Sequence, residues 1–281
     1  MSKIIVTPKN EKHLNKLLDD KIDTVLLSIE NLSINSEYYI SLNKLREILP
    51  KIKEKNKEVF ISVNKIMHNY DLEELKICMQ TLKELNVDKI LFYDLSILSI
   101  ADKLNITNKL VIYNEHSNAS ISSHKFYQSY GVDESLITSD ITLEEINEIK
   151  KQTGIKLIVP VYGHIPIMYS RRYLLTNYFN HIKKQMTSPY YYFKQNEDKY
   201  IIKEEPYGTG IYSGKIINLD EEYKKYQNTF DYIILYSNFI DASIYDNTIK
   251  HYLNINELDK FDNSYKGFAY TKTTYKVKKD E

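Results

Sequence analysis

The residues whose types could do chemistry are concentrated between Val159 and Phe179. An apolar run from Lys156 to Val161 predicts a strand, and Gly163 loosens the backbone where that strand stops. Polar and aromatic groups then crowd together: Tyr162, His164, Tyr169, Ser170, Arg171 and Arg172. Because such a cluster at a strand end is typical of the mouth of a pocket, we expect the functional site here.

Two kinds of chemistry fit this cluster. His164 and Tyr162 are candidates for acid–base catalysis or substrate orientation, because histidine titrates near neutral pH. The alternative is a buried histidine that hydrogen-bonds within the rim of a barrel. We expect Arg171 and Arg172 to open a helix and grip a carboxylate or phosphate, helped by the helix N-terminus. In the alternative, one arginine pairs structurally and the other is solvated.

Short apolar runs alternate with amphipathic segments, a pattern that predicts a parallel sheet covered by helices. Eight strands are expected, at Lys3–Thr7, Thr24–Ile29, Glu58–Asn64, Lys89–Tyr93, Lys109–Tyr113, Leu136–Ser139, Lys156–Val161 and Tyr232–Tyr236. Helices are expected between them, at Glu11–Leu18, Leu42–Lys55, Asp71–Leu85, Ile97–Leu104, Ile121–Tyr130, Thr142–Thr153 and Glu221–Tyr226, with a last one from Asn238 to about Leu258. The prediction is one α/β domain, a TIM-like (β/α)8 barrel.

Two segments lie outside this alternation. Residues 188–219 are rich in tyrosine and isoleucine and punctuated by turns, which predicts a small β-hairpin insert between strands seven and eight. Residues 260–281 form a C-terminal extension whose tail alternates Tyr, Thr and Lys, as a final strand would. A chain of 281 residues suits a barrel of about 250 residues with an insert.

In such barrels the reactive groups lie where strands end. This rule collects Asn64, Asp94, Asn114–His116, Asp140 and His164 on one face. Asp140, Glu115 and Asp94 are pocket carboxylates in one interpretation and helix N-caps in the other, and the cap is favoured for Asp140. His116 and His68 are expected outside the pocket. Asp71, with Glu74 after it, is expected to cap its helix.

Composition limits the class of protein. The net charge is +0, so any RNA binding needs a local patch rather than a global field. The single cysteine, Cys78, excludes an internal disulfide and a four-cysteine iron–sulfur site, and it lies on an apolar helix face where a core role is expected. Neither a signal segment nor a membrane span is evident, so a cytoplasmic protein is expected. Motifs of zinc and serine proteases are absent.

Several stretches together resemble peptidase family U32, the collagenase-like proteases. The strongest is Tyr169–Tyr178, which reads YSRRYLLTNY. The others are Val63–Asn69, Asn114–Ser123 with Tyr130–Val132, the insert segment Gly208–Ser213, and Gly267-Phe268 with Thr273–Lys278. The chain is most similar to a short form of the family, which is paired with a longer paralogue and implicated in 5-hydroxyuridine formation in tRNA. The resemblance makes Ser170, Asn177 and Asn64 substrate-binding candidates beside the arginines and Glu115.

The resemblance also implies partners. It implies prephenate as a co-substrate and an iron–sulfur cluster in the longer relatives, which this chain has no cysteine set to hold. Two departures favour a partner-dependent role: Val161-Tyr162-Gly163-His164 replaces a Val-His-Gly turn, and Thr138–Ile141 replaces Ala-Arg-Glu-Leu. We therefore expect a tRNA-hydroxylation factor acting with a larger U32 paralogue. The alternatives are a peptidase and a non-catalytic scaffold.

Overall fold

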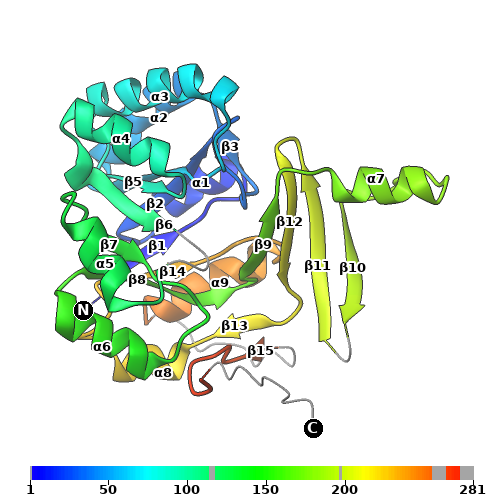
Figure 1. The fold of residues 1–281 in the computed structure, drawn as a ribbon. Coiled ribbons are helices and arrows are strands. Elements are labelled where there is room, and N and C mark those ends of the chain that lie inside the picture. Colours follow the sequence, from blue (N-terminus) through cyan, green and yellow to red (C-terminus); the bar gives the residue numbers. More distant parts are fainter. Residues whose placement is uncertain (1, 114–117, 196–197, 255–263, 273–281) are drawn as a thin grey trace, which may run out of the picture.

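The chain folds into a closed parallel barrel with an attached insert. The structure is a computed structural model that describes residues 2–113, 118–195, 198–254 and 264–272. The barrel strands follow the order β14-β1-β2-β4-β5-β6-β7-β8, and β14 pairs with β8 to close the ring. They are β1 (Lys3–Val6), β2 (Thr24–Ile29), β4 (Glu58–Val63), β5 (Lys89–Phe92), β6 (Leu110–Tyr113), β7 (Glu134–Leu136), β8 (Lys156–Gly163) and β14 (Tyr232–Leu235). The predicted TIM-like barrel is confirmed (Figure 1).

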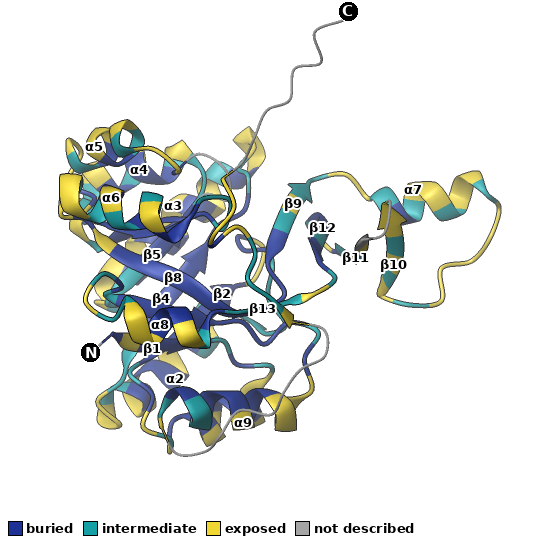
Figure 2. Ribbon diagram, turned by 90° about the horizontal axis from the view of Figure 1, so that it is seen from below, coloured by how far each residue is buried: buried dark blue, intermediate teal, exposed yellow. Residues whose placement is uncertain are grey.

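Helices surround this barrel because the strands are apolar on both faces. All six residues of β2 are buried, for example. The covering helices are α1 (Glu11–Leu17), α2 (Leu42–Glu54), α3 (Leu72–Glu84), α4 (Leu95–Leu104), α5 (Ile121–Gln128), α6 (Leu143–Thr153), α8 (Asp220–Lys225) and α9 (Ala242–Tyr252). Two 3-10 turns, η1 (Asn69–Asp71) and η2 (Thr107–Lys109), and the short strand β3 (Tyr39–Ile40) complete the connections. Figure 2 shows the strands buried beneath helices whose outer faces are exposed.

Local signals explain where several helices begin. Thr142 caps α6: its hydroxyl accepts from the Glu145 amide at 3.2 Å, and the Glu145 carboxylate accepts from the Thr142 amide at 2.8 Å. Asp140 is therefore not the cap that was expected. Of the two interpretations left open for Asp94, the structure shows the cap, since its carboxylate accepts from the Ser96 amide at 2.9 Å. Strand β7 ends at Leu136, earlier than predicted, which leaves the residues after it in a loop.

The insert is a four-stranded antiparallel sheet in the order β10-β11-β12-β9. It comprises β9 (Pro166–Ser170), β10 (Tyr190–Gln195), β11 (Asp198–Glu205) and β12 (Gly208–Ser213), with helix α7 (Leu174–His181). It lies between β8 and β14, as predicted, but its first strand begins at Pro166 rather than after residue 188. The sheet stands beside the barrel, with α7 at its outer side (Figures 1 and 2).

This arrangement corrects one prediction. Ser170, Arg171 and Arg172 do not open a helix, because Ser170 ends β9 and pairs with Thr209 of β12. The helix begins only at Leu174. Gly208 permits the close packing here, since a Cβ at that position would lie 2.2 Å from the Ser170 carbonyl oxygen. The two arginines therefore lie in a bend on the insert rather than at a helix N-terminus.

The C-terminal segment lies against the barrel beside β8. Strand β15 (Ser264–Tyr265) pairs with β13 (Ile216–Asn218), which pairs in turn with β8. The Leu143 amide donates to the Ala269 carbonyl at 3.1 Å, which joins the following turn to α6. The tail from Gly267 was expected to form a final strand, but residues 267–270 form a turn, and residues 273–281 lie outside the described residues. Across the described residues, every helix is too short or too polar to cross a membrane.

Candidate functional site

The candidate site is the carboxyl end of the barrel, where it meets the insert. Parallel strands place the residues that follow them at one end, and those after β4, β7 and β8 include Asn64, Asp140 and His164. Glu115 and His116, which follow β6, lie outside the described residues. The insert leaves the barrel from β8, so its sheet borders this same end.

His164 is held at the end of β8 by an unusual turn. Gly163 has a φ of +123°, and a Cβ there would lie 2.7 Å from the Cβ of Tyr236, so glycine is required. His164 is 7% exposed, and its Nδ1 lies 2.6 Å from the Ser213 carbonyl oxygen. Because a carbonyl only accepts, this contact assigns the proton to Nδ1 and leaves Nε2 as an acceptor. Burial lowers the pKa of His164 despite the Ser213 contact, which favours the neutral ring.

The other two residues predicted for catalysis lie in different surroundings. Tyr162 is fully buried in β8, and burial raises the pKa of its phenol, which contact with Thr248 of α9 partly opposes. Its hydroxyl thus meets the covering helix layer. Asp140 is half-buried in the loop after β7 and lines a cavity. The catalytic roles of all three residues remain predictions.

Arg171 joins the insert to the barrel. Its guanidinium donates to the Asp71 carboxylate at 2.6 Å, the Ile66 carbonyl at 2.8 Å and the Tyr70 hydroxyl at 2.6 Å. Lys65 completes the cluster, with its ammonium 2.8 Å from the other Asp71 oxygen. Lys65 and Asp71 are 3% and 7% exposed in their side chains, so this is a buried ion pair. Arg171 is thus the arginine that pairs structurally, as the alternative in the sequence analysis described.

The charge balance in this cluster fixes the ionisation of Asp71. Burial alone raises the pKa of a carboxyl group, but hydrogen bonds from Lys65, the His68 amide and Arg171 outweigh it. The pKa of Asp71 is consequently lowered to about 2. The Asp71 carboxylate was expected to cap α3, but it instead accepts hydrogen bonds from the Lys65 ammonium, the His68 amide and the Arg171 guanidinium.

The remaining substrate-binding candidates are dispersed. Arg172 and Asn177 are exposed on the insert, and the Ser170 hydroxyl accepts from the Arg172 amide at 3.2 Å. Asn64 is buried, and its side-chain oxygen accepts from the Ile34 amide at 3.0 Å, which fixes the loop after β2. The structure therefore does not bring Arg172 and Asn177 together with His164, and their binding roles remain predictions.

Sequence reasoning missed the residues that organise this end of the barrel. Lys65 and Asp71 were available as opposite charges in a predicted loop, but their partner Arg171 lies 100 residues beyond Asp71. Asn118 was also missed. Its amide donates to the Leu136 carbonyl at 2.6 Å and accepts from the Thr138 amide at 3.1 Å, which shapes the loop after β7.

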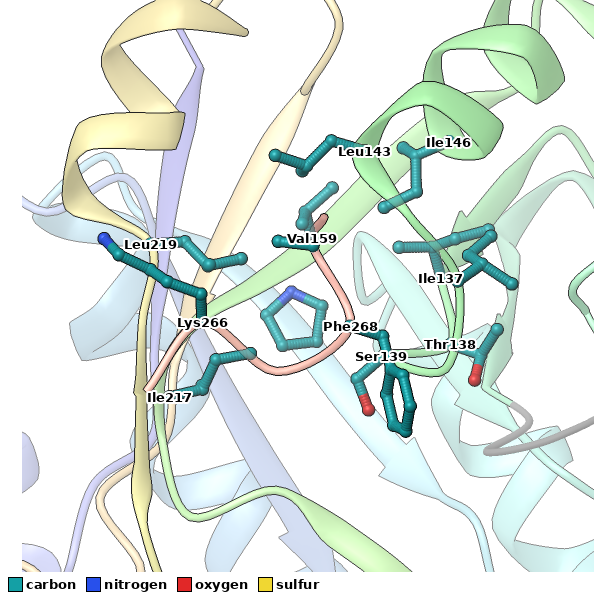
Figure 3. Close-up of a pocket in the computed structure, with 13 residues that line it drawn as sticks. Ile137, Thr138, Ser139, Leu143, Ile146, Val159, Ile217, Leu219, Lys266 and Phe268 are labelled. Atoms are coloured by element: carbon teal, nitrogen blue, oxygen red, sulfur yellow. The ribbon is translucent and has the colours of Figure 1, made fainter. Parts of the chain in front are cut away.

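Hollows near the site differ in size. One, drawn in Figure 3, lies between β7, β8 and the C-terminal turn, and its volume of about 20 Å³ holds little more than one water. Another measures about 440 Å³ and lies between the loop after β7, the insert and the C-terminal segment. Its polar lining includes Asp140, Lys199, Ser213 and Lys215. Ser213, whose carbonyl oxygen accepts from His164, lines this larger cavity, whereas His164 itself is not part of its lining.

Metal ligation and thiol chemistry find no support among the described residues. No group of three or more His, Cys, Asp or Glu side chains gathers there as a metal ion would require. Cys78 lies in the core of α3, as predicted, and burial raises the pKa of its thiol to about 12. Its single thiol does not fit an iron–sulfur cluster, which needs several thiolates.

Comparison with known proteins agrees with this fold. The sequence pattern of Peptidase family U32 matches residues 9–263. The chain belongs to peptidase family U32. The U32 peptidase Mk0906 has a solved structure that superposes with a TM-score of 0.56 at 13% identity, covering 84% of this chain and 92% of that one. This structural likeness supports the shared barrel fold alone.

Two curated relatives come from Bacillus subtilis (strain 168). The first, tRNA hydroxylation protein P2, is 22% identical over 227 residues, which cover 78% of this U32 chain and 74% of the relative. The second, tRNA hydroxylation protein P1, is 22% identical over 121 residues, which cover 43% of this chain and 29% of that protein. Because the same 121 residues are a smaller share of P1, P1 is the longer chain.

Proposed function

We propose that this U32 protein acts in the 5-hydroxylation of the wobble uridine of tRNA, as the smaller member of a pair with a larger U32 paralogue. The observation that carries this proposal is the similarity to tRNA hydroxylation protein P2 over similar shares of both chains. The partial match to the longer P1 supports a two-protein system. Any iron–sulfur cluster would belong to the larger member, because Cys78 is a buried core residue here.

The geometry at the end of β8 supports a role for His164 in this reaction. Its Nε2 is the acceptor left after Nδ1 binds Ser213, and it suits a general base or an orienting group. The cavity of about 440 Å³ that Ser213 lines is large enough for a small substrate, and Lys199 and Lys215 would favour an anionic one. Prephenate, implied by the family resemblance, is a co-substrate of this class. Arg171 would support the site from outside, through Asp71.

Peptidase activity is less well supported by the side chains. A serine–histidine pair does exist, with His124 Nε2 at 3.2 Å from the Ser135 hydroxyl, but both residues are fully buried and closed to a polypeptide. The Cys78 thiol is also buried, and its raised pKa disfavours the reactive thiolate. The described residues thus present no accessible activated nucleophile of these two kinds.

Deleting the gene and measuring 5-hydroxyuridine derivatives in digested tRNA by mass spectrometry tests the proposal. We expect these nucleosides to disappear and to return when the wild-type gene is restored. Unchanged levels in a strain without a second hydroxylation route would contradict the proposal. Gelatin degradation by the purified protein, lost in His164→Asn, would support the peptidase alternative. Full rescue by His164→Asn together with loss on altering the surface would support a scaffold.

A further inference from the structure

A line of aromatic rings connects the outer strand of the insert to His164. Tyr192 and Tyr190 on β10 lie 5.9 Å apart between ring centroids, and Tyr190 lies 5.4 Å from Phe239 in the loop after β14. Phe239 in turn lies 6.0 Å from the imidazole of His164. We call Tyr192, Tyr190 and Phe239 the aromatic track. It runs from an exposed sheet edge to the candidate site.

The track is open to solvent at its outer end. Tyr192 is 52% exposed and Tyr190 is 37% exposed, whereas Phe239 is half-buried. Both tyrosines belong to the same face of β10, because alternate residues of a strand share a face. Tyr212 of β12, whose ring lies 4.9 Å from Phe239, borders the inner end. The rings of Tyr190 and Tyr192 therefore leave part of their flat surface open to a ligand.

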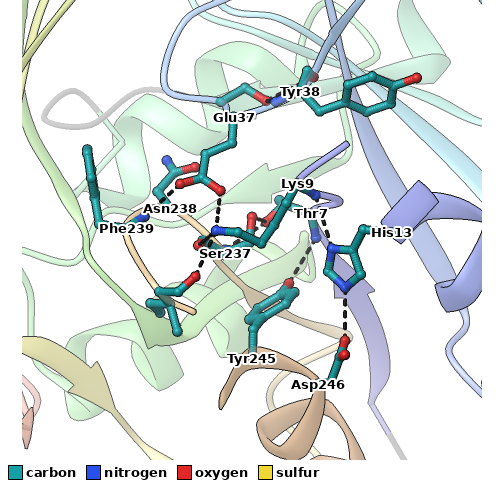
Figure 4. Close-up of polar contacts among 12 residues, drawn as sticks. Thr7, Lys9, His13, Glu37, Tyr38, Ser237, Asn238, Phe239, Tyr245 and Asp246 are labelled. Carbon is teal, nitrogen blue, oxygen red and sulfur yellow. Dashed lines mark hydrogen bonds and ion pairs between the residues drawn. The ribbon is translucent and has the colours of Figure 1, made fainter. Parts of the chain in front are cut away.

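Phe239 is held rigidly in an uncommon backbone conformation. Its φ of +61° is rare for a bulky residue and persists only where the surroundings enforce it. Its amide donates to the Glu37 carboxylate at 2.9 Å. The Lys9 ammonium donates to the carbonyls of Ser237 and Ile240 at 3.0 and 2.7 Å, on either side of it (Figure 4). This network fixes the ring that joins the two tyrosines to His164.

Two lysines lie beside the exposed end of the track. Lys194 and Lys199 are opposite each other in the β10–β11 ladder, on the face that carries Tyr190 and Tyr192. Like charges directly opposite in a sheet destabilise it, so this pair points to an anionic ligand. The Lys199 ammonium lies 3.9 Å from the ring centroid of Tyr192, and the same lysine lines the cavity of about 440 Å³.

We propose that the aromatic track binds a single-stranded segment of RNA and leads it toward His164. Bases stack on tyrosine rings whatever their identity, while Lys194 and Lys199 neutralise phosphates. A protein strand added to the open edge of β10 would be held by backbone hydrogen bonds and would need neither the tyrosines nor the lysines. The identification of this RNA as the tRNA anticodon loop rests on the proposed function, whereas the binding surface itself does not.

The test measures binding of a fluorescein-labelled oligouridylate to the full chain by fluorescence anisotropy. Stacking is worth roughly 1–3 kcal/mol per base, so Tyr190→Leu and Tyr192→Leu are each expected to weaken binding at least fivefold. Tyr178→Leu is the matched control, because Tyr178 is 56% exposed on α7 and lies outside the track. Circular dichroism spectra that match the wild type show that each variant is folded.

Salt dependence tests the lysines separately. Each phosphate contact to a single strand contributes about 0.7 to the slope of log K against log salt, so the double variant Lys194→Gln, Lys199→Gln should lower that slope by about 1.4. Lys184→Gln, an exposed lysine after α7, should leave it unchanged. Equal RNA binding by the wild type and the track variants would overturn the proposal, as would no binding by the wild type.

Three further outcomes separate the aromatic track from the proposed function or assign its surface to another partner. If gene deletion leaves 5-hydroxyuridine unchanged but oligouridylate binding depends on the tyrosines, the track stands and the tRNA role fails. If deletion abolishes the modification while the variants bind RNA normally, the track is refuted alone. Normal RNA binding with loss of a co-purifying larger protein would reassign the surface of β10 to protein docking and overturn the proposal.

Discussion

Replacing Arg171 by methionine tests whether this arginine is a structural link between the insert and the barrel. Methionine keeps an unbranched apolar stem but removes the donors to Asp71, Ile66 and Tyr70. Arg172→Met is the matched control, since Arg172 is the exposed neighbour in the same bend. The family-like sequence Ser170-Arg171-Arg172 thus supplies both the test and its control.

The size of the effect follows from the partners that remain. Breaking a buried ion pair costs about 3–5 kcal/mol, and a hydrogen bond to a charged group contributes about 1.5–3 kcal/mol. Asp71 keeps the Lys65 ammonium and the His68 amide, each at 2.8 Å, and the Arg171 side chain is 19% exposed. We therefore expect Arg171→Met to lower the free energy of unfolding by about 2–3 kcal/mol, and Arg172→Met by less than about 0.5 kcal/mol.

The same cluster predicts a pH dependence. The folded-state pKa of Asp71 is lowered to about 2, so the stability it contributes is present above the unfolded value near 4. That contribution, roughly 2 kcal/mol, is lost as the pH falls through about 2. Because Arg171 helps to lower this pKa, the difference between wild type and Arg171→Met should shrink as the pH falls from about 4 to about 2.

Urea unfolding followed by far-ultraviolet circular dichroism measures both effects, since the chain contains no tryptophan for fluorescence. We expect a lower urea midpoint for Arg171→Met than for Arg172→Met at pH 7, and we expect the midpoints of the wild type and Arg171→Met to converge in acid. Equal midpoints for the two variants at pH 7 would refute the structural role of Arg171.

The turn at Gly163 and the buried thiol of Cys78 give two independent predictions. Gly163→Ala should lower the free energy of unfolding by more than about 2 kcal/mol, because the new Cβ would meet Tyr236 at 2.7 Å in a φ of +123°. Gly154→Ala is the control, because Gly154 has a φ of +68° but no atom within 4 Å of the position of its Cβ, and it should lower the free energy of unfolding by only about 1 kcal/mol. Urea midpoints compare the two variants, and equal losses of stability would refute the clash with Tyr236. Cys78 should react with a thiol reagent at pH 8 only after urea unfolds the chain, and rapid reaction of the native protein would show that the thiol is accessible.

The barrel was predictable because its signals are local. Runs such as Thr24–Ile29 are buried along their whole length, and Thr142 with Glu145 caps α6 within four residues. Gly163 also carried a local signal, since glycine after a strand marks a backbone position that other residues avoid. These features depend on near neighbours in the chain, which a single sequence contains.

The insert and the site could be predicted only in part, because their contacts are distant in sequence. The strand Pro166–Ser170 pairs with β12, about forty residues later, so its alternation alone did not distinguish it from a loop before a helix. The sequence predicted Arg171 as an anion-binding residue, but in the structure its guanidinium donates to the Asp71 carboxylate. The aromatic track likewise joins β10 to Phe239, a contact that composition and spacing do not reveal.

The most direct test of the central claim is the 5-hydroxyuridine content of tRNA in a deletion strain that expresses His164→Asn at the wild-type level. The asparagine amide can still donate to the Ser213 carbonyl, as Nδ1 does, but it lacks the acceptor at Nε2. We expect the 5-hydroxyuridine content to fall at least tenfold relative to the strain with the wild-type gene. Full restoration of 5-hydroxyuridine by His164→Asn would contradict the claim that the end of β8 is the functional site.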